Sequence, residues 1–127
     1  MLWINDSKAT NVSSTLVALK GMTRPTIVLL GGRHKGEPYG ALVPPLRRVG
    51  KAVLAYGEAG PLIAQDLANV VPVHLLASDF EQVMTMARSL ARPGDVVLLS
   101  PACSSYDMFR NYEERGRAFK RLAQDGA

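Results

Sequence analysis

The sequence predicts an α/β fold of the Rossmann-like class, with an open, mostly parallel sheet and helices on both of its faces. Four short segments rich in Val, Ile and Leu recur at similar intervals, and each is mainly apolar without strict alternation, as strands buried on both faces are. Segments with helical spacing of apolar residues separate them, and the connections are short. A chain of 127 residues, 47% of them hydrophobic, suffices for one such core, so we expect a single domain over residues 1–127.

Helices and strands alternate along the chain. The predicted strands are residues 26–30, 51–56, 71–76 and 95–99, and the predicted helices are residues 11–20, 41–49, 60–70, 80–91 and 113–124. Asn11 is placed to cap the first helix, and Gly21 is placed to end it. Pro44 and Pro45 must lie in the first turn of the second helix, the only part of a helix that tolerates them well.

The helices of the second half have clearer boundaries. Ser78 or Asp79 can cap the fourth helix, and Pro93 with Gly94 stops it. A short helix is expected to begin near Tyr106. The last helix places Phe119, Leu122 and Ala123 on one face, with Arg115, Arg117, Lys120 and Arg121 around it.

Composition excludes several classes of protein. Cys103 is the only cysteine, so neither an internal disulfide nor a multi-cysteine zinc site can form, and we expect no metal site. No apolar run approaches the roughly 20 residues that cross a bilayer, and the N-terminus lacks a secretory signal, so we expect a cytoplasmic protein without membrane insertion. The net charge of +4 suits anionic small molecules or weak nucleic-acid contact, and serves solubility equally well.

Three polar loops are candidates for a binding site. Residues 31–36 follow the first predicted strand and residues 100–105 follow the last, so both open on the carboxyl edge of the sheet, where ligands bind in this fold. Residues 5–11 precede the first helix, and the pattern does not place them relative to that edge. Paired glycines with a lysine can hold an anion, although Gly31 and Gly32 also suit a simple turn.

The other polar residues of these loops also have two readings. Ser104 and Ser105 can cap a helix or hold a carboxylate. Cys103 suits a buried packing position better than a nucleophile, because neither histidine can be assigned to it as a base.

Three motifs of common enzyme classes are missing from the sequence. There is no Gly-x-x-x-x-Gly-Lys-Ser/Thr phosphate loop, no Gly-x-Gly-x-x-Gly dinucleotide fingerprint and no Gly-x-Ser-x-Gly nucleophile elbow. The residues alone therefore predict an anion-binding module without a visible catalytic centre.

Three longer motifs of the sequence resemble those of a known protein family. They are Asn-Asp-Ser-Lys-Ala-Thr-Asn at 5–11, Leu-Leu-Gly-Gly at 29–32 followed by Lys35, and Leu-Leu-Ser-Pro-Ala-Cys-Ser-Ser-Tyr-Asp-Met-Phe at 98–109 followed by Tyr-Glu-Glu-Arg-Gly at 112–116. In this order they resemble the C-terminal domain of the D-glutamate-adding Mur ligases, the UDP-N-acetylmuramoyl-L-alanine:D-glutamate ligases of bacterial peptidoglycan synthesis. The resemblance covers essentially the whole chain.

The resemblance implies an ATP-dependent amide ligase. In this family ATP phosphorylates the carboxylate of UDP-N-acetylmuramoyl-L-alanine, and the amine of D-glutamate attacks the acyl phosphate. ATP and Mg²⁺ are bound mainly by a central domain, an N-terminal domain binds the UDP-sugar, and the C-terminal domain closes over both. Residues 1–11 would be the interdomain hinge, the chain's partners would be its own two missing domains rather than nucleic acid, and the chain alone would be inactive.

The resemblance also assigns roles by position. Thr10 and Lys35 match residues that hold the α-carboxylate of D-glutamate, and Ser105 and the backbone at Tyr112 match those that hold its γ-carboxylate. Asp6 matches a residue that contacts the ATP ribose, and Lys8 one near the transferred phosphate, which makes Lys8 the catalytic candidate. A lysine suits a developing phosphoryl charge, and two separated donors suit a dicarboxylate.

Three positions depart from the family pattern. Arg33 and His34 stand where an acidic and a small residue are frequent, and Tyr112 stands where Phe is usual. The competing interpretation is a stand-alone, non-catalytic anion-binding or interaction module of the same fold.

Overall fold

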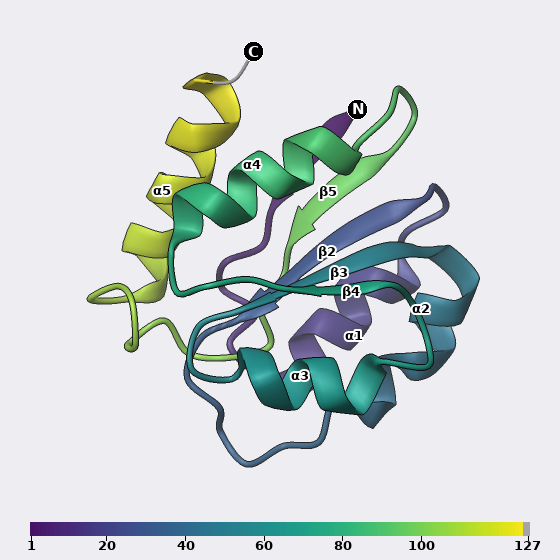
Figure 1. The fold of residues 1–127 in the computed structure, drawn as a ribbon, viewed down its shortest axis with the longest axis horizontal. Coiled ribbons are helices and arrows are strands. Elements are labelled where there is room, and N and C mark those ends of the chain that lie inside the picture. Colours follow the sequence, from purple (N-terminus) through teal and green to yellow (C-terminus); the bar gives the residue numbers. More distant parts are fainter. Residues whose placement is uncertain (126–127) are drawn as a thin grey trace.

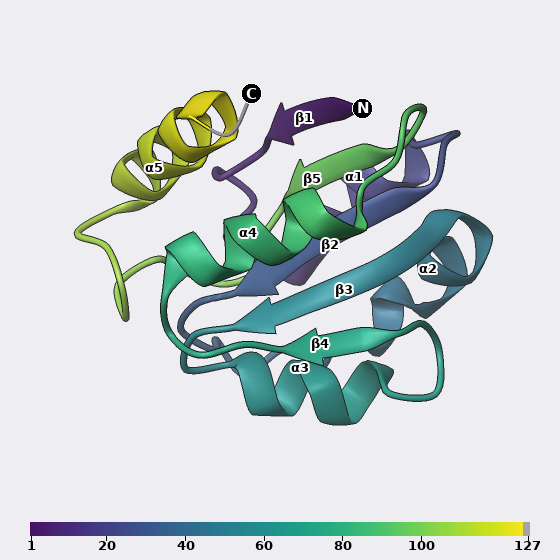
Figure 2. The same cartoon turned by 45° about the horizontal axis from the view of Figure 1, so that its top comes forward.

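The strands form because their side chains are covered on both sides: every residue of β2 (Thr26–Gly31) and β5 (Val96–Leu99) is buried. In the computed structural model, which describes residues 1–125, five parallel strands make one sheet in the order β1-β5-β2-β3-β4 (Figure 1, with all five strands labelled in Figure 2). The other elements are β1 (Leu2–Asn5), α1 (Val12–Lys20), the short 3-10 helix η1 (Gly40–Leu42), α2 (Val43–Val49), β3 (Gly50–Tyr56), α3 (Gly60–Leu67), β4 (Val73–Leu75), α4 (Phe80–Leu90) and α5 (Tyr112–Asp125). The predicted fold class is confirmed.

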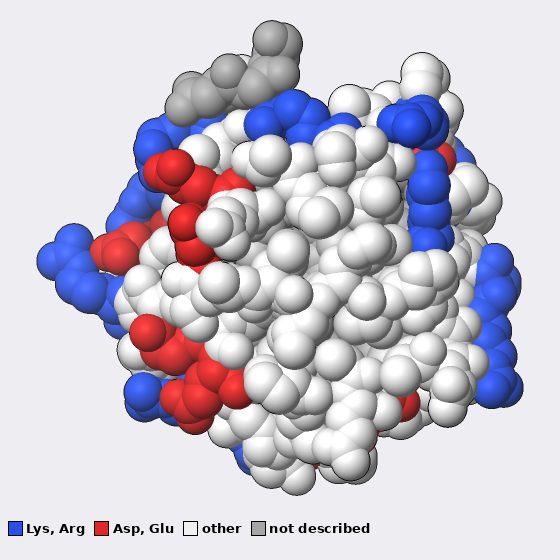
Figure 3. Space-filling model, viewed as in Figure 1, with Lys and Arg blue, Asp and Glu red and all other residues white. Residues whose placement is uncertain are grey.

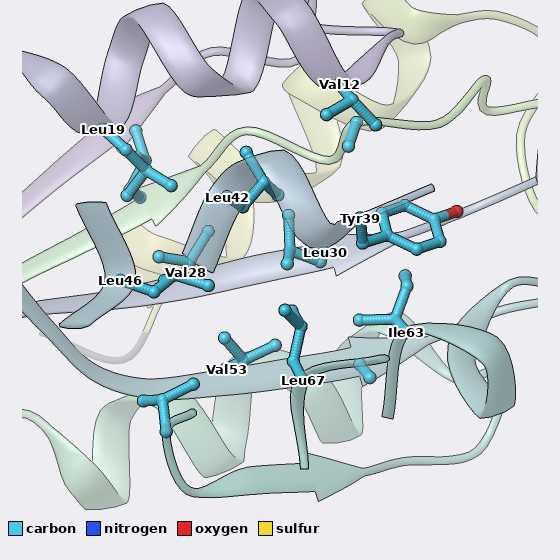
Figure 4. Close-up of a cluster of buried hydrophobic side chains, with 14 of the residues drawn as sticks. Val12, Leu19, Val28, Leu30, Tyr39, Leu42, Leu46, Val53, Ile63 and Leu67 are labelled. Atoms are coloured by element: carbon cyan, nitrogen blue, oxygen red, sulfur yellow. The ribbon is translucent and has the colours of Figure 1, made fainter. Parts of the chain in front are cut away.

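Helices cover both faces of the sheet, as Figure 2 shows. Alternate residues of β2 point to opposite faces, so Val28 and Leu30 pack with α1, α2 and α3, while Ile27 and Leu29 pack with α4 and α5. Figure 4 shows the first of these two layers, in which Leu30 lies among side chains from the surrounding helices. The two layers therefore bury both faces of the sheet.

Side chains at two helix starts behave as the sequence predicts. Asn11 Oδ1 accepts a hydrogen bond from Ser14 N at 2.9 Å, and Asp79 Oδ1 accepts one from Glu81 N at 3.0 Å. Each satisfies one of the amide groups that the first turn of a helix leaves without an intrahelical acceptor.

The structure corrects the predicted elements at several points. Strand β1 was not predicted, because it has only four residues, is half-exposed, and pairs with residues 96–99 at the far end of the chain. The short helix expected near Tyr106 is a single turn, in which Met108 N and Phe109 N donate to Ser105 O. Strand β4 and helix α3 are shorter than predicted.

Within residues 1–125 no helix is long and apolar enough to cross a membrane. Charged side chains are unevenly distributed over the surface. On the face drawn in Figure 3, lysine and arginine side chains lie around the margin, and the centre is largely uncharged.

Candidate functional site

The two loops expected at the carboxyl edge of the sheet lie side by side. Gly31 N donates to Pro101 O at 3.2 Å, and Arg33 N donates to Ser104 O at 2.9 Å, where a short antiparallel bridge forms. The loop after β2 and the loop after β5 are therefore joined through their backbones, although about 70 residues separate them.

The third polar segment, residues 5–11, lies at the same edge. Asp6 N donates to Leu99 O at 2.7 Å, directly after β1, and Ala102 N donates to Ala9 O at 2.9 Å. Strand β1 positions this segment by pairing with β5, so the missed strand is what brings Asp6, Lys8 and Thr10 to the site.

Gly32 is required for the close approach of the two loops. Its φ is +130°, and a Cβ there would collide with Ser104 O and lie 3.1 Å from Cys103 Cβ. Only glycine combines this backbone conformation with the absence of a side chain. The Gly-Gly pair is thus more than a turn, because it lets one loop lie against the other.

Several contacts hold the loop that carries Lys35. Gly32 O accepts from Ala59 N at 2.8 Å, and His34 Nδ1 hydrogen-bonds Tyr39 Oη at 2.9 Å. Glu37 Oε1 accepts from Val12 N at 3.2 Å, which ties the loop to the start of α1. Lys35 itself is exposed on this anchored loop.

The Glu37 contact brings the Lys35 loop to the helix start that follows Thr10, which is half-buried. The two residues assigned to one carboxylate therefore come from adjoining segments. Arg33, in contrast, points to an exposed pair with Glu58, at 3.6 Å between Nε and Oε2, and such pairs contribute little.

Asp6 and Lys8 line a hollow of about 340 Å³ between the segment after β1 and the start of α5. Asp6 Oδ2 accepts from Ser100 Oγ at 2.8 Å, which fixes the carboxylate and leaves Oδ1 to accept from a ligand. Lys8 is exposed. Tyr112, Arg117 and Lys120 contribute to the opposite wall, so cations lie on both sides of the hollow.

Ser105 and Tyr112 bracket the turn that leads into α5. Ser105 is buried, and its carbonyl accepts from Met108 N and Phe109 N. Asn111 Oδ1 accepts from Glu114 N at 2.8 Å and so caps α5, and Tyr112 O accepts from Ser7 Oγ at 2.6 Å. The structure thus brings the segments of all six predicted site residues to one edge.

Sequence reasoning missed Arg115. The last helix was predicted to carry this residue beside its apolar face, but only 1% of Arg115 is exposed. The signal was present in the spacing, because Arg115 precedes Phe119 by four residues and Leu122 by seven, which places all three on one helix face. Burial lowers the pKa of the guanidinium from its ordinary value.

Cys103 has the environment of a packing residue. Its side chain is fully buried, and Sγ lies 3.1 Å from Tyr39 Oη. Burial raises the pKa of the thiol above its ordinary value, and burial likewise raises that of the Tyr39 hydroxyl. A protonated, inaccessible thiol is a poor nucleophile.

The chemistry that this edge offers is the binding of anions. Exposed Lys8 and Lys35 lie on segments that are each joined by backbone hydrogen bonds to residues 99–104, and the first turn of α5 lines the same hollow as Lys8. Within the described residues, no three His, Cys, Asp or Glu side chains are grouped to hold a metal ion.

A protein-family model for the glutamate ligase domain of Mur ligases matches residues 1–103. The chain belongs to the Mur ligase family. The match includes residues 5–11 and 31–36, which are two of the three segments that form the site.

Two Mur ligases show how similar this chain is to its relatives and how much of each relative it covers. UDP-N-acetylmuramoylalanine--D-glutamate ligase of Salinibacter ruber is 48% identical over 124 residues, which are 98% of this chain and 27% of the relative. The enzyme of the same name from Chlamydia trachomatis serovar D is 49% identical over 120 residues, which are 94% of this chain and 28% of the relative. The chain thus spans less than a third of the length of these relatives.

A solved domain of a Haemophilus ducreyi protein, described as a UDP-N-acetylmuramate:L-alanyl-gamma-D-glutamyl-diaminopimelate ligase, matches 97% of this chain and 82% of its own. The identity is 19% and the TM-score 0.49. The fold class of this Mur ligase domain rests on the sheet described above and not on that likeness.

Proposed function

We propose that this chain is the D-glutamate-binding domain of an ATP-dependent ligase that joins D-glutamate to UDP-N-acetylmuramoyl-L-alanine. The observation that carries the proposal is the joining of three sequence-distant segments, residues 5–11, 31–37 and 100–112, at the carboxyl edge of one sheet. Two relatives named for this reaction are nearly half identical to the chain over almost its whole length. The rest of such an enzyme would lie in two further domains, with residues 1–11 as the hinge.

D-glutamate would be held at two ends. The Lys35 ammonium and Thr10 hydroxyl, on the segments joined through Glu37 and Val12, would bind the α-carboxylate. The Ser105 hydroxyl and the amide of Tyr112 would bind the γ-carboxylate at the start of α5, where the helix dipole favours an anion. Such positioning makes the attack of the amine on an activated acyl group effectively unimolecular.

The nucleotide side of the site would be residues 6–8. Ser100 Oγ donates to Asp6 Oδ2, so Oδ1 would be the oxygen that accepts from a ribose hydroxyl. A carboxylate acceptor held in this way suits a nucleoside hydroxyl. Lys8, in the same hollow, would stabilise phosphoryl charge. ATP supplies the group that activates the acyl carboxylate. Mg²⁺ and the phosphate-loop contacts would come mainly from the central domain, so no step is assigned to a metal here, and the reaction would take place in the cytoplasm.

A chimeric enzyme tests this function directly. The matching region of the Salinibacter ruber relative is replaced by this chain, and phosphate release is measured with ATP, UDP-N-acetylmuramoyl-L-alanine and either D- or L-glutamate. We expect release that depends on D-glutamate and not on L-glutamate. A folded chimera with no D-glutamate-dependent release would contradict the proposal and favour a non-catalytic module.

Variants of the chimera test the residue roles. Lys35→Ala and Thr10→Ala should raise the KM for D-glutamate at least tenfold, because each removes a carboxylate donor. Lys20→Ala, which alters an exposed lysine at the end of α1, is the matched control and should leave the KM unchanged. Unaltered KM values in both site variants would overturn these assignments.

A further inference from the structure

Arg115 is a buried cation that hydrogen-bonds backbone carbonyls and a serine hydroxyl rather than a carboxylate. Its Nε donates to Ser7 Oγ at 3.0 Å and its Nη2 to Ser7 O at 2.9 Å, while Nη1 donates to Cys103 O at 3.1 Å and lies 3.5 Å from Gly31 O. Among residues 1–125 it forms no ion pair. A guanidinium buried in this way is costly unless its donors are satisfied, and here four of its five N–H groups have acceptors in reach.

These acceptors belong to the three segments that form the site. Ser7 lies between Asp6 and Lys8, Gly31 begins the loop of Lys35, and Cys103 lies two residues before Ser105. Arg115 itself is on the first turns of α5. Ser7 Oγ, which accepts from Arg115, also donates to Tyr112 O at 2.6 Å, so it links Arg115 to the start of the helix. One side chain therefore touches every segment that carries a proposed ligand contact.

We propose that Arg115 is a positioning residue that locks the nucleotide side of the site, at Asp6 and Lys8, to the glutamate side, at Lys35, Ser105 and Tyr112. The inference rests on the proposed function and deepens it, since both substrates of the ligase would then be aligned by one buried fork. The planar guanidinium is suited to this task because its donors point in fixed directions, whereas a lysine ammonium is a point charge on a flexible stem.

The positive charge of Arg115 adds to the effect. In the described part of the chain no carboxylate is paired with it, although Asp107 and Tyr56 lie within electrostatic reach. Its charge therefore makes the potential at this edge of the sheet more favourable for anions. Comparing Arg115→Lys with Arg115→Met separates the two contributions, because lysine retains the charge and loses the fork.

The first test measures the positions of the segments in this chain alone. Backbone amide NMR signals of Lys8, Lys35, Ser105 and Tyr112 are compared between the wild type and Arg115→Lys. We expect all four signals to shift together, and we expect none to shift in Arg121→Lys, which alters an exposed arginine of the same helix. Unshifted signals in a folded Arg115→Lys variant would overturn the proposal.

The second test measures catalysis in the chimera described above. Arg115→Lys should lower kcat/KM about 100-fold, the loss that a misplacement of about 1 Å can cause, with KM for D-glutamate and for ATP both raised. Arg115→Met should lower kcat/KM further, because it removes the positive charge as well as the fork. A purely structural role would lower the thermal midpoint and leave both KM values of the folded enzyme unchanged. Full rescue by lysine would assign the effect to charge and overturn the positioning role.

Ser7→Ala is the milder variant if Arg115 substitutions do not fold. It removes only the hydroxyl between Arg115 Nε and Tyr112 O, so kcat/KM should fall at least fivefold, and its effect should be non-additive with Arg115→Lys. Ser13→Ala, in an exposed serine of α1, is its control. If the wild-type chimera lacks D-glutamate-dependent turnover, the proposed function fails, whereas the NMR comparison still decides whether Arg115 positions the segments.

Discussion

Substituting Gly32 should separate the two site loops. A methyl group at this residue would collide with the Ser104 carbonyl oxygen and lie 3.2 Å from Arg115 Nη1, in a backbone conformation with φ of +130° that L side chains rarely adopt. The conformation costs about 2 kcal/mol, and loss of the Arg33 N to Ser104 O hydrogen bond costs about 1 kcal/mol. Displacement of the backbone adds about 1 kcal/mol, so Gly32→Ala should lower the free energy of unfolding by about 4 kcal/mol.

Urea unfolding of this chain measures that loss. Gly94→Ala is the matched control, because Gly94 also has a positive φ, of +92°, but no atom lies within 4 Å of a Cβ built there. It should cost only about 2 kcal/mol, the conformational part alone. If Gly32→Ala were no more destabilising than Gly94→Ala, the close packing of the two loops would not require glycine, and the account of this turn would be wrong.

Three further predictions concern single side chains. The hydrogen bond from Lys51 holds the pKa of Asp95 below its usual value, so this carboxylate stabilises the fold above about pH 4. That contribution is lost as the pH falls through the lowered pKa. Asp95→Asn should therefore unfold more easily at pH 7 and lose less stability than the wild type when the pH is lowered. Asn11→Ala should cost about 1 kcal/mol in urea unfolding, because Ser14 N loses its acceptor. Cys103 should resist alkylation by iodoacetamide at pH 8 in the folded chain and react in 8 M urea, since burial raises its pKa; equal rates would show an accessible thiol.

Local patterns predicted most of the fold. Strands β2 and β5 were predicted because both of their faces are buried, which leaves a continuous apolar run in the sequence. Strand β1 left no such signal, since an edge strand with half-exposed side chains resembles an irregular terminus. The turn after Ser105 was mistaken for a helix because serine caps both kinds of structure.

The sequence predicted which loops form the candidate site, but not how all three lie relative to one another. Chain order and the parallel sheet already placed residues 31–36 and 100–105 on one edge. The position of residues 5–11 could not be predicted, because it depends on the pairing of β1 with β5 across more than 90 residues. The burial of Arg115 was missed for a related reason. An arginine is expected to be exposed unless the hydrogen-bond acceptors that satisfy its guanidinium in the fold are known.

By itself, therefore, the sequence determined the alternation of helices and strands, the parallel sheet, and the residue types that can bind anions, since each depends on local periodicity and chemistry. Only the tertiary structure decided how the three loops meet, why Gly32 must be glycine, and that Arg115 ties the loops together. Those features arise from hydrogen bonds between residues up to 108 positions apart, and neither hydrophobic spacing nor composition encodes such pairs in a form that can be read locally.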